Sequence, residues 1–137
     1  MKANAQLHFD GHCMEAFKFY EKVLSGKVTF AMTWGESPMA SEVAQEWHKK
    51  IIHATLEFGD QAIYGDDAPQ GRYEKPQGID ICLGFKTSET AKAETIFIRL
   101  AENGKIRMPF GKTFFSPGFG MVVDQFGVPW IVHCEQK

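Results

Sequence analysis

The second half of the chain repeats the pattern of the first half, and this repeat constrains the fold more than any other feature of the sequence. Residues 16–28 hold an apolar stripe at helical spacing, closed by Gly26 and followed by a β-branched residue. Residues 93–106 hold the same arrangement, closed by Gly104. A duplicated unit of this length indicates a supersecondary module rather than a short solenoid repeat. A second echo, in the same register, joins residues 58–64 to residues 126–132.

Hydrophobic periodicity predicts the same order of elements in each half: one strand, one helix and three further strands. We expect helices over residues 12–25 and 88–103, with Asp10 as the N-cap of the first and Gly26 as its stop. Residues 35–50 are polar and indicate an insertion with one short helix. The predicted strands span residues 5–9, 27–34, 51–58, 61–65, 79–86, 105–110 (with Phe114 and Phe115 as a possible extension), 120–124 and 128–134.

One helix for every four strands is too little alternation for a doubly wound parallel sheet. The sequence therefore predicts an α+β fold, in which two βαβββ modules form a cupped, mixed, mostly antiparallel sheet. Helices would cover one face, and the other face would curve around a ligand. We expect a single domain over residues 1–137, with module one at 1–66, a connector at 67–78 and module two at 79–137. Two prolines and two glycines mark residues 66–78 as the connecting region.

Composition argues against several classes of partner. The 137 residues carry a formal net charge of -2 and no cluster of Lys and Arg, which argues against a nucleic-acid or anionic-membrane surface. No apolar run approaches a membrane span, and the N-terminal residues lack the apolar segment of a signal peptide. Cys13, Cys82 and Cys134 lie far apart with no CxxC motif, which is typical of reduced thiols in a cytoplasmic protein.

Four segments, taken in order, resemble the PhnB-like branch of the vicinal-oxygen-chelate superfamily, which includes glyoxalase I, extradiol dioxygenases and fosfomycin- and bleomycin-resistance proteins. The segments are FDGHCMEAFKFYEKVLSGKV, IIHATLEFGDQAIYGDD, AENGKIRMPFGKTFFSPGFG and VDQFGVPWIVH. This branch is often labelled a 3-demethylubiquinone-9 3-methyltransferase domain. The resemblance implies a glyoxalase/bleomycin-resistance-like cupped sheet, a homodimer and a small-molecule pocket. It does not imply a reaction, because this fold hosts many chemistries.

The resemblance also implies positions for a divalent ion, on the first, fourth, fifth and eighth strands. These positions fall near Gln6 (or His8 if the register shifts), Tyr64, Asp80 and Ile131. Only Gln6 and Asp80 are possible ligands at the unshifted positions, whereas a divalent site needs about three converging ligands. We therefore expect no cofactor and no metal at this site, with a divalent ion in an atypical site as the alternative.

His53 is the best candidate for a catalytic or anchoring residue, although the sequence identifies no catalytic residue outright. Strand alternation places it on one face with Ile51, Thr55 and Glu57. A neutral histidine there could donate to a ligand oxygen or act as a base near neutral pH. The alternative is a structural histidine bonded to a neighbouring strand. The other polar candidates are expected to be solvated or to end elements, namely His8, His12, His48, Asp66, Asp67 and His133.

Cys13 has two interpretations, because it lies near the start of a helix and also within the helix's apolar stripe. A helix N-terminus lowers a thiol pKa, whereas the stripe would bury the thiol; we favour burial.

The resemblance predicts a pocket on the concave face, since strands of both modules line it in that family. Aromatic walls and one polar anchor are typical of such sites. The expected ligand-binding residues are Trp34, His53, Tyr64, Phe115, Met121 and Trp130.

These features favour binding or sequestration of a small organic molecule. The alternative is an enzyme, such as a lyase, isomerase or dioxygenase, with an atypical metal site. Methyl transfer ranks last, because Asp10-Gly11-His12 follow the first strand where a nucleotide-binding methyltransferase would carry a Gly-rich loop. Ile98 lies off the apolar stripe of the second helix and supports the dimer that the resemblance implies.

Overall fold

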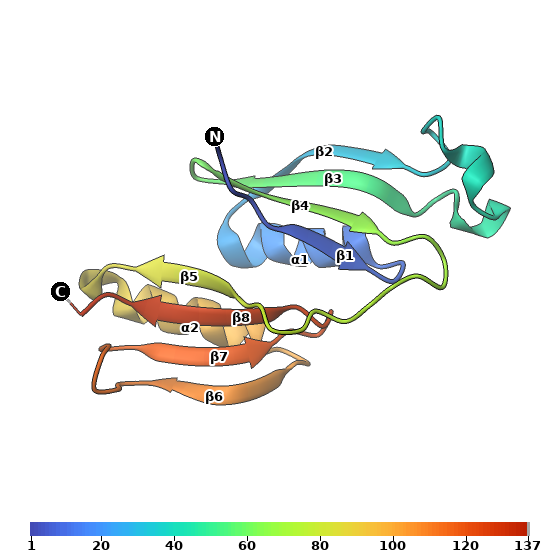
Figure 1. The fold of residues 1–137 in the computed structure, drawn as a ribbon. Coiled ribbons are helices and arrows are strands. Elements are labelled where there is room, and N and C mark those ends of the chain that lie inside the picture. The colour runs from blue at the N-terminus through green and yellow to red at the C-terminus, as the bar shows by residue number, and fades with distance from the viewer. Residues whose placement is uncertain (137) are drawn as a thin grey trace. The chain divides into compact units, whose positions relative to one another are not determined.

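The chain forms two compact units, each with a four-stranded sheet and one α-helix (Figure 1). The structure is a computed structural model that describes residues 1–136. Along the chain, the first unit ends at Glu74 and the second begins at Lys75. Two mixed sheets with few helices confirm the predicted α+β class. Within the described residues, every helix is too short or too polar to cross a membrane.

The first unit contains all the elements that precede the connector. Its strand order is β1-β4-β3-β2, in which β1 runs parallel to β4 and the other pairs are antiparallel. Two 3-10 turns, η1 and η2, interrupt the chain between β2 and β3. The elements are β1 (Gln6–Phe9), α1 (Cys13–Leu24), β2 (Lys27–Thr33), η1 (Ala40–Glu42), η2 (Gln45–Trp47), β3 (Ile51–Phe58) and β4 (Gln61–Asp67).

The second unit repeats this plan. Its strand order is β5-β8-β7-β6, with β5 parallel to β8 and the remaining pairs antiparallel. Each unit is therefore a βαβββ module, as the sequence repeat predicts, and in each the first strand pairs with the last. The elements are β5 (Ile81–Phe85), η3 (Thr87–Glu89), α2 (Thr90–Leu100), β6 (Lys105–Gly111), β7 (Phe119–Val123) and β8 (Pro129–Cys134).

Helix α1 covers one face of the first sheet, and a glycine permits the close approach. A Cβ on Gly65 would lie 2.5 Å from the Phe17 ring, so β4 has no room for a side chain there. Ala54 and Leu56 are fully buried on the same face. Because side chains alternate along a strand, His53 and the other residues of opposite parity lie on the uncovered face. We call this surface the first open face.

Helix α2 covers one face of the second sheet in the same way. A Cβ on Gly120 would lie 2.7 Å from the Phe97 ring, and the neighbouring Val122, Trp130 and Val132 are fully buried. The residues of opposite parity form the second open face. Ile98 is 59% exposed on α2, so it lies off the buried stripe as predicted.

The start of α1 corrects two expectations. Its N-cap is His12, which makes no side-chain cap, and Asp10 is not the N-cap. The Asp67 carboxylate replaces a local cap: its Oδ1 accepts the N–H groups of Gly11 and Cys13 at 2.9 Å each, and its Oδ2 accepts the Ile51 N–H at 2.8 Å. Asp67 is 1% exposed, so the prediction that it is solvated was wrong. The cap comes from a strand far away in the sequence, and local spacing does not reveal it.

Other boundaries differ from the sequence prediction by local turn chemistry. The insertion holds two 3-10 turns instead of one short helix, and β2 ends at Thr33, one residue before Trp34. Helix α2 is preceded by the turn η3, where the Glu89 carboxylate accepts the Lys86 N–H at 3.0 Å. Phe114 and Phe115 do not extend β6, because the chain turns after Gly111.

The three thiols differ in accessibility. Cys13 and Cys134 are fully buried, and Cys82 is exposed. The full burial of Cys13 confirms the buried interpretation of this residue, and burial, together with the charges of Asp67 and Asp66, raises its pKa well above the usual range. Burial and the charge of Asp80 also raise the pKa of Cys82.

We expect a thiol reagent at pH 8 to label one cysteine per native chain, because only Cys82 is accessible. Mass spectrometry would count the labels. Denaturant should expose all three thiols, and Cys82→Ser should abolish native labelling. Since the pKa of Cys82 is raised, its labelling rate should keep increasing with pH beyond the range in which an unfolded thiol levels off. Rapid native labelling of Cys13 would contradict the burial.

Candidate functional site

The first open face gathers the polar and aromatic side chains that the helix does not cover. Cross-strand pairing sets Met32 beside His53, Thr55 beside Tyr64, Gln6 beside Tyr64 and His8 beside Asp66. Side chains opposite one another on neighbouring strands are within contact range. The surface thus combines residues from all four strands: Gln6, His8, Phe30, Met32, His53, Thr55, Tyr64 and Asp66.

His53 lies between two aromatic rings in the middle of this face. Its ring centroid is 5.5 Å from that of Tyr64 and 6.0 Å from that of Phe30, and the side chain is half-buried. Within residues 1–136, neither imidazole nitrogen forms a hydrogen bond to the protein. The alternative of a structural histidine bonded to a neighbouring strand is therefore not what the structure shows. Its nitrogens remain available to a ligand.

A second polar group lies at the β1–β4 edge of the same face. His8 Nδ1 lies 2.9 Å from Asp66 Oδ1 and 3.0 Å from Asp66 Oδ2, and Gln6 Nε2 donates to Oδ2 at 2.7 Å. With Nδ1–H donated to the carboxylate, His8 keeps Nε2 as an acceptor. The Asp66 side chain is 17% exposed and that of His8 is 58% exposed, so the imidazole remains open to solvent.

Sequence reasoning missed this group, because it treated His8 and Asp66 as separate solvated residues. The signal that could have found it is strand parity. If β1 and β4 pair in parallel, as the first and last strands of a module, residues two apart on each strand share a face. Gln6 and His8 then lie beside Tyr64 and Asp66.

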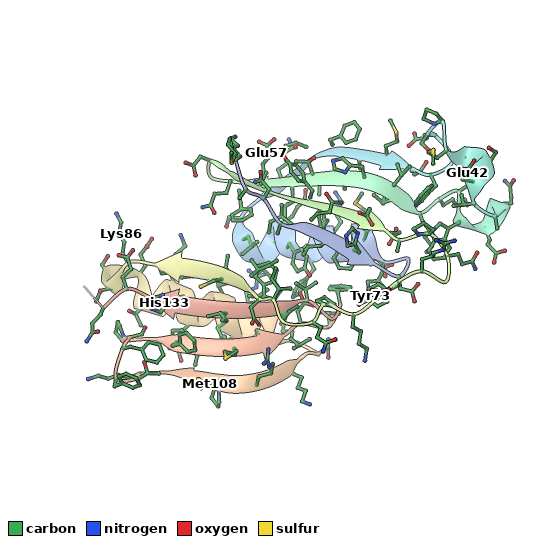
Figure 2. The ribbon with its side chains drawn as sticks, viewed as in Figure 1. Glu42, Glu57, Tyr73, Lys86, Met108 and His133 are labelled. Carbon is green, nitrogen blue, oxygen red and sulfur yellow. The ribbon has the colours of Figure 1, made fainter. Side chains whose placement is uncertain are left out.

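The second open face is more apolar. Phe115 packs against Phe119 with ring centroids 5.0 Å apart, and Phe119 lies 5.9 Å from the His133 ring. Met121 pairs with both Ile131 and Met108 across the sheet. Figure 2 labels His133 on β8 and Met108 on β6, and β7 lies between these two strands. Buried Ser116 fixes the loop before β7, since its hydroxyl lies 2.6 Å from the Cys134 carbonyl.

The structure places Trp130 on the covered side of its sheet and Trp34 at the end of β2, next to the last residue of β4. Trp130 is fully buried on the α2 side of its sheet, where its indole N–H donates to Asp124 Oδ2 at 2.8 Å. Trp34 is 8% exposed, and its indole N–H donates to the Asp67 carbonyl at 3.1 Å. Of the expected ligand-binding residues, His53 and Tyr64 lie together on the first open face, and Phe115 and Met121 lie on the second.

The side chains do not fit the divalent ion that the fold family implies. Among residues 1–136, no three His, Cys, Asp or Glu side chains gather closely enough to hold a metal ion. His8 and Asp66 are two ligand types, but they bind each other, and Gln6 completes the carboxylate's partners. Asp80 is engaged by Arg107 at 3.3 Å, and Ile131 has no ligand atom. A site of about three converging ligands is therefore not built from these groups.

Comparison with known proteins identifies the family. The family model of 3-demethylubiquinone-9 3-methyltransferase matches residues 1–133. Protein YjdN of Escherichia coli K12 is 30% identical over 145 residues, covering 100% of this chain and 97% of YjdN. Protein PA1353 of Pseudomonas aeruginosa is 37% identical with a TM-score of 0.87, over 100% of this chain and 99% of that one.

More distant structures share the fold. A PhnB protein of Bacillus cereus superposes with a TM-score of 0.79 at 24% identity, over 98% and 99% of the two chains. A glyoxylase/bleomycin resistance protein/dioxygenase domain from Frankia superposes with a TM-score of 0.70 at 10% identity, over 100% of this chain and 93% of that one. The paired βαβββ plan thus matches in detail the resemblance found in the sequence. The chain belongs to the 3-demethylubiquinone-9 3-methyltransferase family, and it shares the fold of a PhnB protein and of a glyoxylase/bleomycin resistance protein/dioxygenase domain.

Proposed function

We propose that this protein binds a small organic molecule on the first open face, with His53 as the polar anchor. The observation that carries the proposal is the position of His53, flanked by the rings of Phe30 and Tyr64 with no protein hydrogen bond among the described residues. A polar side chain held between apolar walls is the usual composition of a small-molecule site.

The chemistry of the face indicates the class of ligand. The rings of Phe30 and Tyr64 offer flat apolar surfaces, and Phe30 is 47% exposed. Aromatic side chains favour stacked or edge-on partners. The free nitrogens of His53 and Nε2 of His8 supply hydrogen bonds beside them. The best match is a compact planar or unsaturated molecule with oxygen substituents, held without covalent change.

Replacing His53 by glutamine is expected to weaken binding of such a ligand about tenfold, because the loss of one hydrogen bond to a site group costs about 1 to 1.5 kcal/mol. A thermal-shift screen of a metabolite library on the whole protein would supply the ligand, and calorimetry would supply the affinities. Glu57→Gln is the matched control, since Glu57 lies at the far end of the same strand (Figure 2). Equal affinities for H53Q and the unmodified protein would contradict the anchor role.

A second candidate is enzymatic, and a specific observation favours it. In the His8–Asp66 pair the carboxylate holds Nδ1 and leaves Nε2 as an exposed base, an arrangement suited to proton transfer in a lyase or isomerase reaction. Turnover of the screened ligand that H8Q abolishes, with binding retained, would establish this candidate over simple binding. Metal analysis of protein purified without chelator would test a dioxygenase with an atypical site. Methyl transfer gains no support from the geometry, despite the family name.

We expect the protein to be a homodimer, as the family architecture implies, and cytoplasmic, as its three unpaired thiols favour. Exposed Ile98 is consistent with an interface on α2. Light scattering at micromolar concentration should give twice the mass of the 15.5 kDa chain. A monomer mass would contradict the dimer, and Ile98→Asp would test the contribution of α2.

A further inference from the structure

We propose that the insertion between β2 and β3 builds a second ligand site, which takes a zwitterionic amino acid or dipeptide with an apolar side chain. The site is a cavity of about 440 Å³, lined by residues of the insertion and of the segment that follows β4. It lies outside both open faces and is independent of the proposed function. Its lining residues are Trp34, Met39, Glu42, Val43, Ala44, Pro69, Gln70 and Arg72.

The insertion departs from the internal repeat of the chain. Residues 34–50 separate β2 from β3, whereas the shorter segment 112–118 separates the corresponding strands β6 and β7. Figure 1 shows the insertion as the two short coils beyond β2. The second module forms the same four-stranded sheet without it, so the βαβββ plan does not need this segment.

The segment is nevertheless firmly built. The indole N–H of Trp34 donates to the Asp67 carbonyl and that of Trp47 donates to the Ala68 carbonyl, each at 3.1 Å. Both tryptophans are 8% exposed. The Ser37 hydroxyl donates to the Trp34 carbonyl at 2.7 Å, and His48 Nε2 lies 2.8 Å from the Ala40 carbonyl. These bonds hold the backbone of the insertion and the Trp34 wall in place before a ligand binds, whereas the Glu42 and Arg72 side chains are exposed.

The lining combines an apolar body with two opposite charges. Trp34, Met39 and Val43 belong to the apolar part, and Glu42 and Arg72 supply a carboxylate and a guanidinium. Neither charged side chain has a hydrogen-bond or ion-pair partner within residues 1–136, and they do not pair with each other. Figure 2 labels Glu42 at the insertion.

Charge complementarity selects the ligand class. An ammonium group pairs with the Glu42 carboxylate, and a carboxylate pairs with the Arg72 guanidinium in its fork geometry. The side chain of the ligand then lies against the apolar wall. A volume of about 440 Å³ is within the range of small-molecule sites and has room for such a molecule.

The test uses the whole protein with L-phenylalanine, L-methionine and the dipeptide Leu-Phe as probes, followed by calorimetry and by amide NMR shifts. We expect the shifts to map to residues 34–50 and 68–72. N-acetyl-phenylalanine lacks the ammonium and phenylalanine amide lacks the carboxylate. Each should bind about tenfold more weakly than phenylalanine, since each loses one charge-assisted hydrogen bond.

Paired variants separate the two charges. Glu42→Gln should remove the discrimination against the N-acetyl probe alone, and Arg72→Gln should remove the discrimination against the amide alone. Lys49→Gln is the matched control on the same insertion, outside the cavity lining, and should leave both discriminations unchanged. H53Q should also leave binding unchanged, which distinguishes this site from the first open face. Absence of any binding tighter than about 10 mM, or shifts confined to the first open face, would overturn the proposal.

Discussion

Replacing Asp67 by alanine is expected to lower the free energy of unfolding by about 3 to 5 kcal/mol, one of the largest effects of any polar substitution in this chain. The carboxylate is 1% exposed and accepts three backbone N–H groups, from Gly11, Cys13 and Ile51. Alanine would leave these donors without their acceptor, two of them at the start of α1, where the helix has no local side-chain cap.

Urea denaturation monitored by circular dichroism would measure the loss, at constant pH and with the slope of the transition compared between proteins. Asp10→Ala is the matched control. Local sequence predicts Asp10 as the cap, but the structure gives it no such role, so its replacement should change stability by no more than about 0.5 kcal/mol. The loss of stability for Asp67→Asn should lie between those for D67A and D10A, since the asparagine amide keeps one acceptor oxygen. A larger loss for D10A than for D67A would contradict the assignment of the cap.

The fold was predictable from the sequence because its signals are local and occur twice. Helical spacing identifies both helices, and alternation identifies the strands to within about two residues at their ends. The residues of β3 show why parity was informative: buried Ala54 and Leu56 alternate with His53 and Thr55. The position of His53 on the face away from the helix therefore follows from the alternation of side chains along β3.

The remaining parts of the site depend on contacts that no local pattern carries. His8 meets Asp66 across 58 positions of sequence, and only the parallel pairing of β1 with β4 brings them together. Trp34 fits a strand by composition, yet β2 ends at Thr33, and the indole N–H of Trp34 donates to the Asp67 carbonyl at the end of β4. An aromatic side chain packs equally well in a hydrophobic core and against a ligand, so the residue type alone does not predict which of the two it does.

Trp130 illustrates the same ambiguity, and its replacement should have the second large effect. Trp130→Ala is expected to lower the free energy of unfolding by about 3 to 5 kcal/mol, because it removes a fully buried aromatic side chain and leaves a cavity under α2. It also removes the indole N–H that donates to Asp124 Oδ2 at 2.8 Å, while Asp124 itself stays buried at 3% exposure. A ligand-wall residue would have no such cost.

Comparison with Trp130→Phe separates the two contributions. Phenylalanine keeps most of the apolar volume and loses only the N–H donor, so we expect a loss of about 1 to 3 kcal/mol for W130F. Phe114→Ala is the control, because Phe114 is 93% exposed and its removal should cost no more than about 0.5 kcal/mol. Urea titrations of the three variants would measure these values. If W130A were as stable as the unmodified protein but lost ligand binding, Trp130 would belong to a binding surface; the buried indole and its bond to Asp124 require the opposite result.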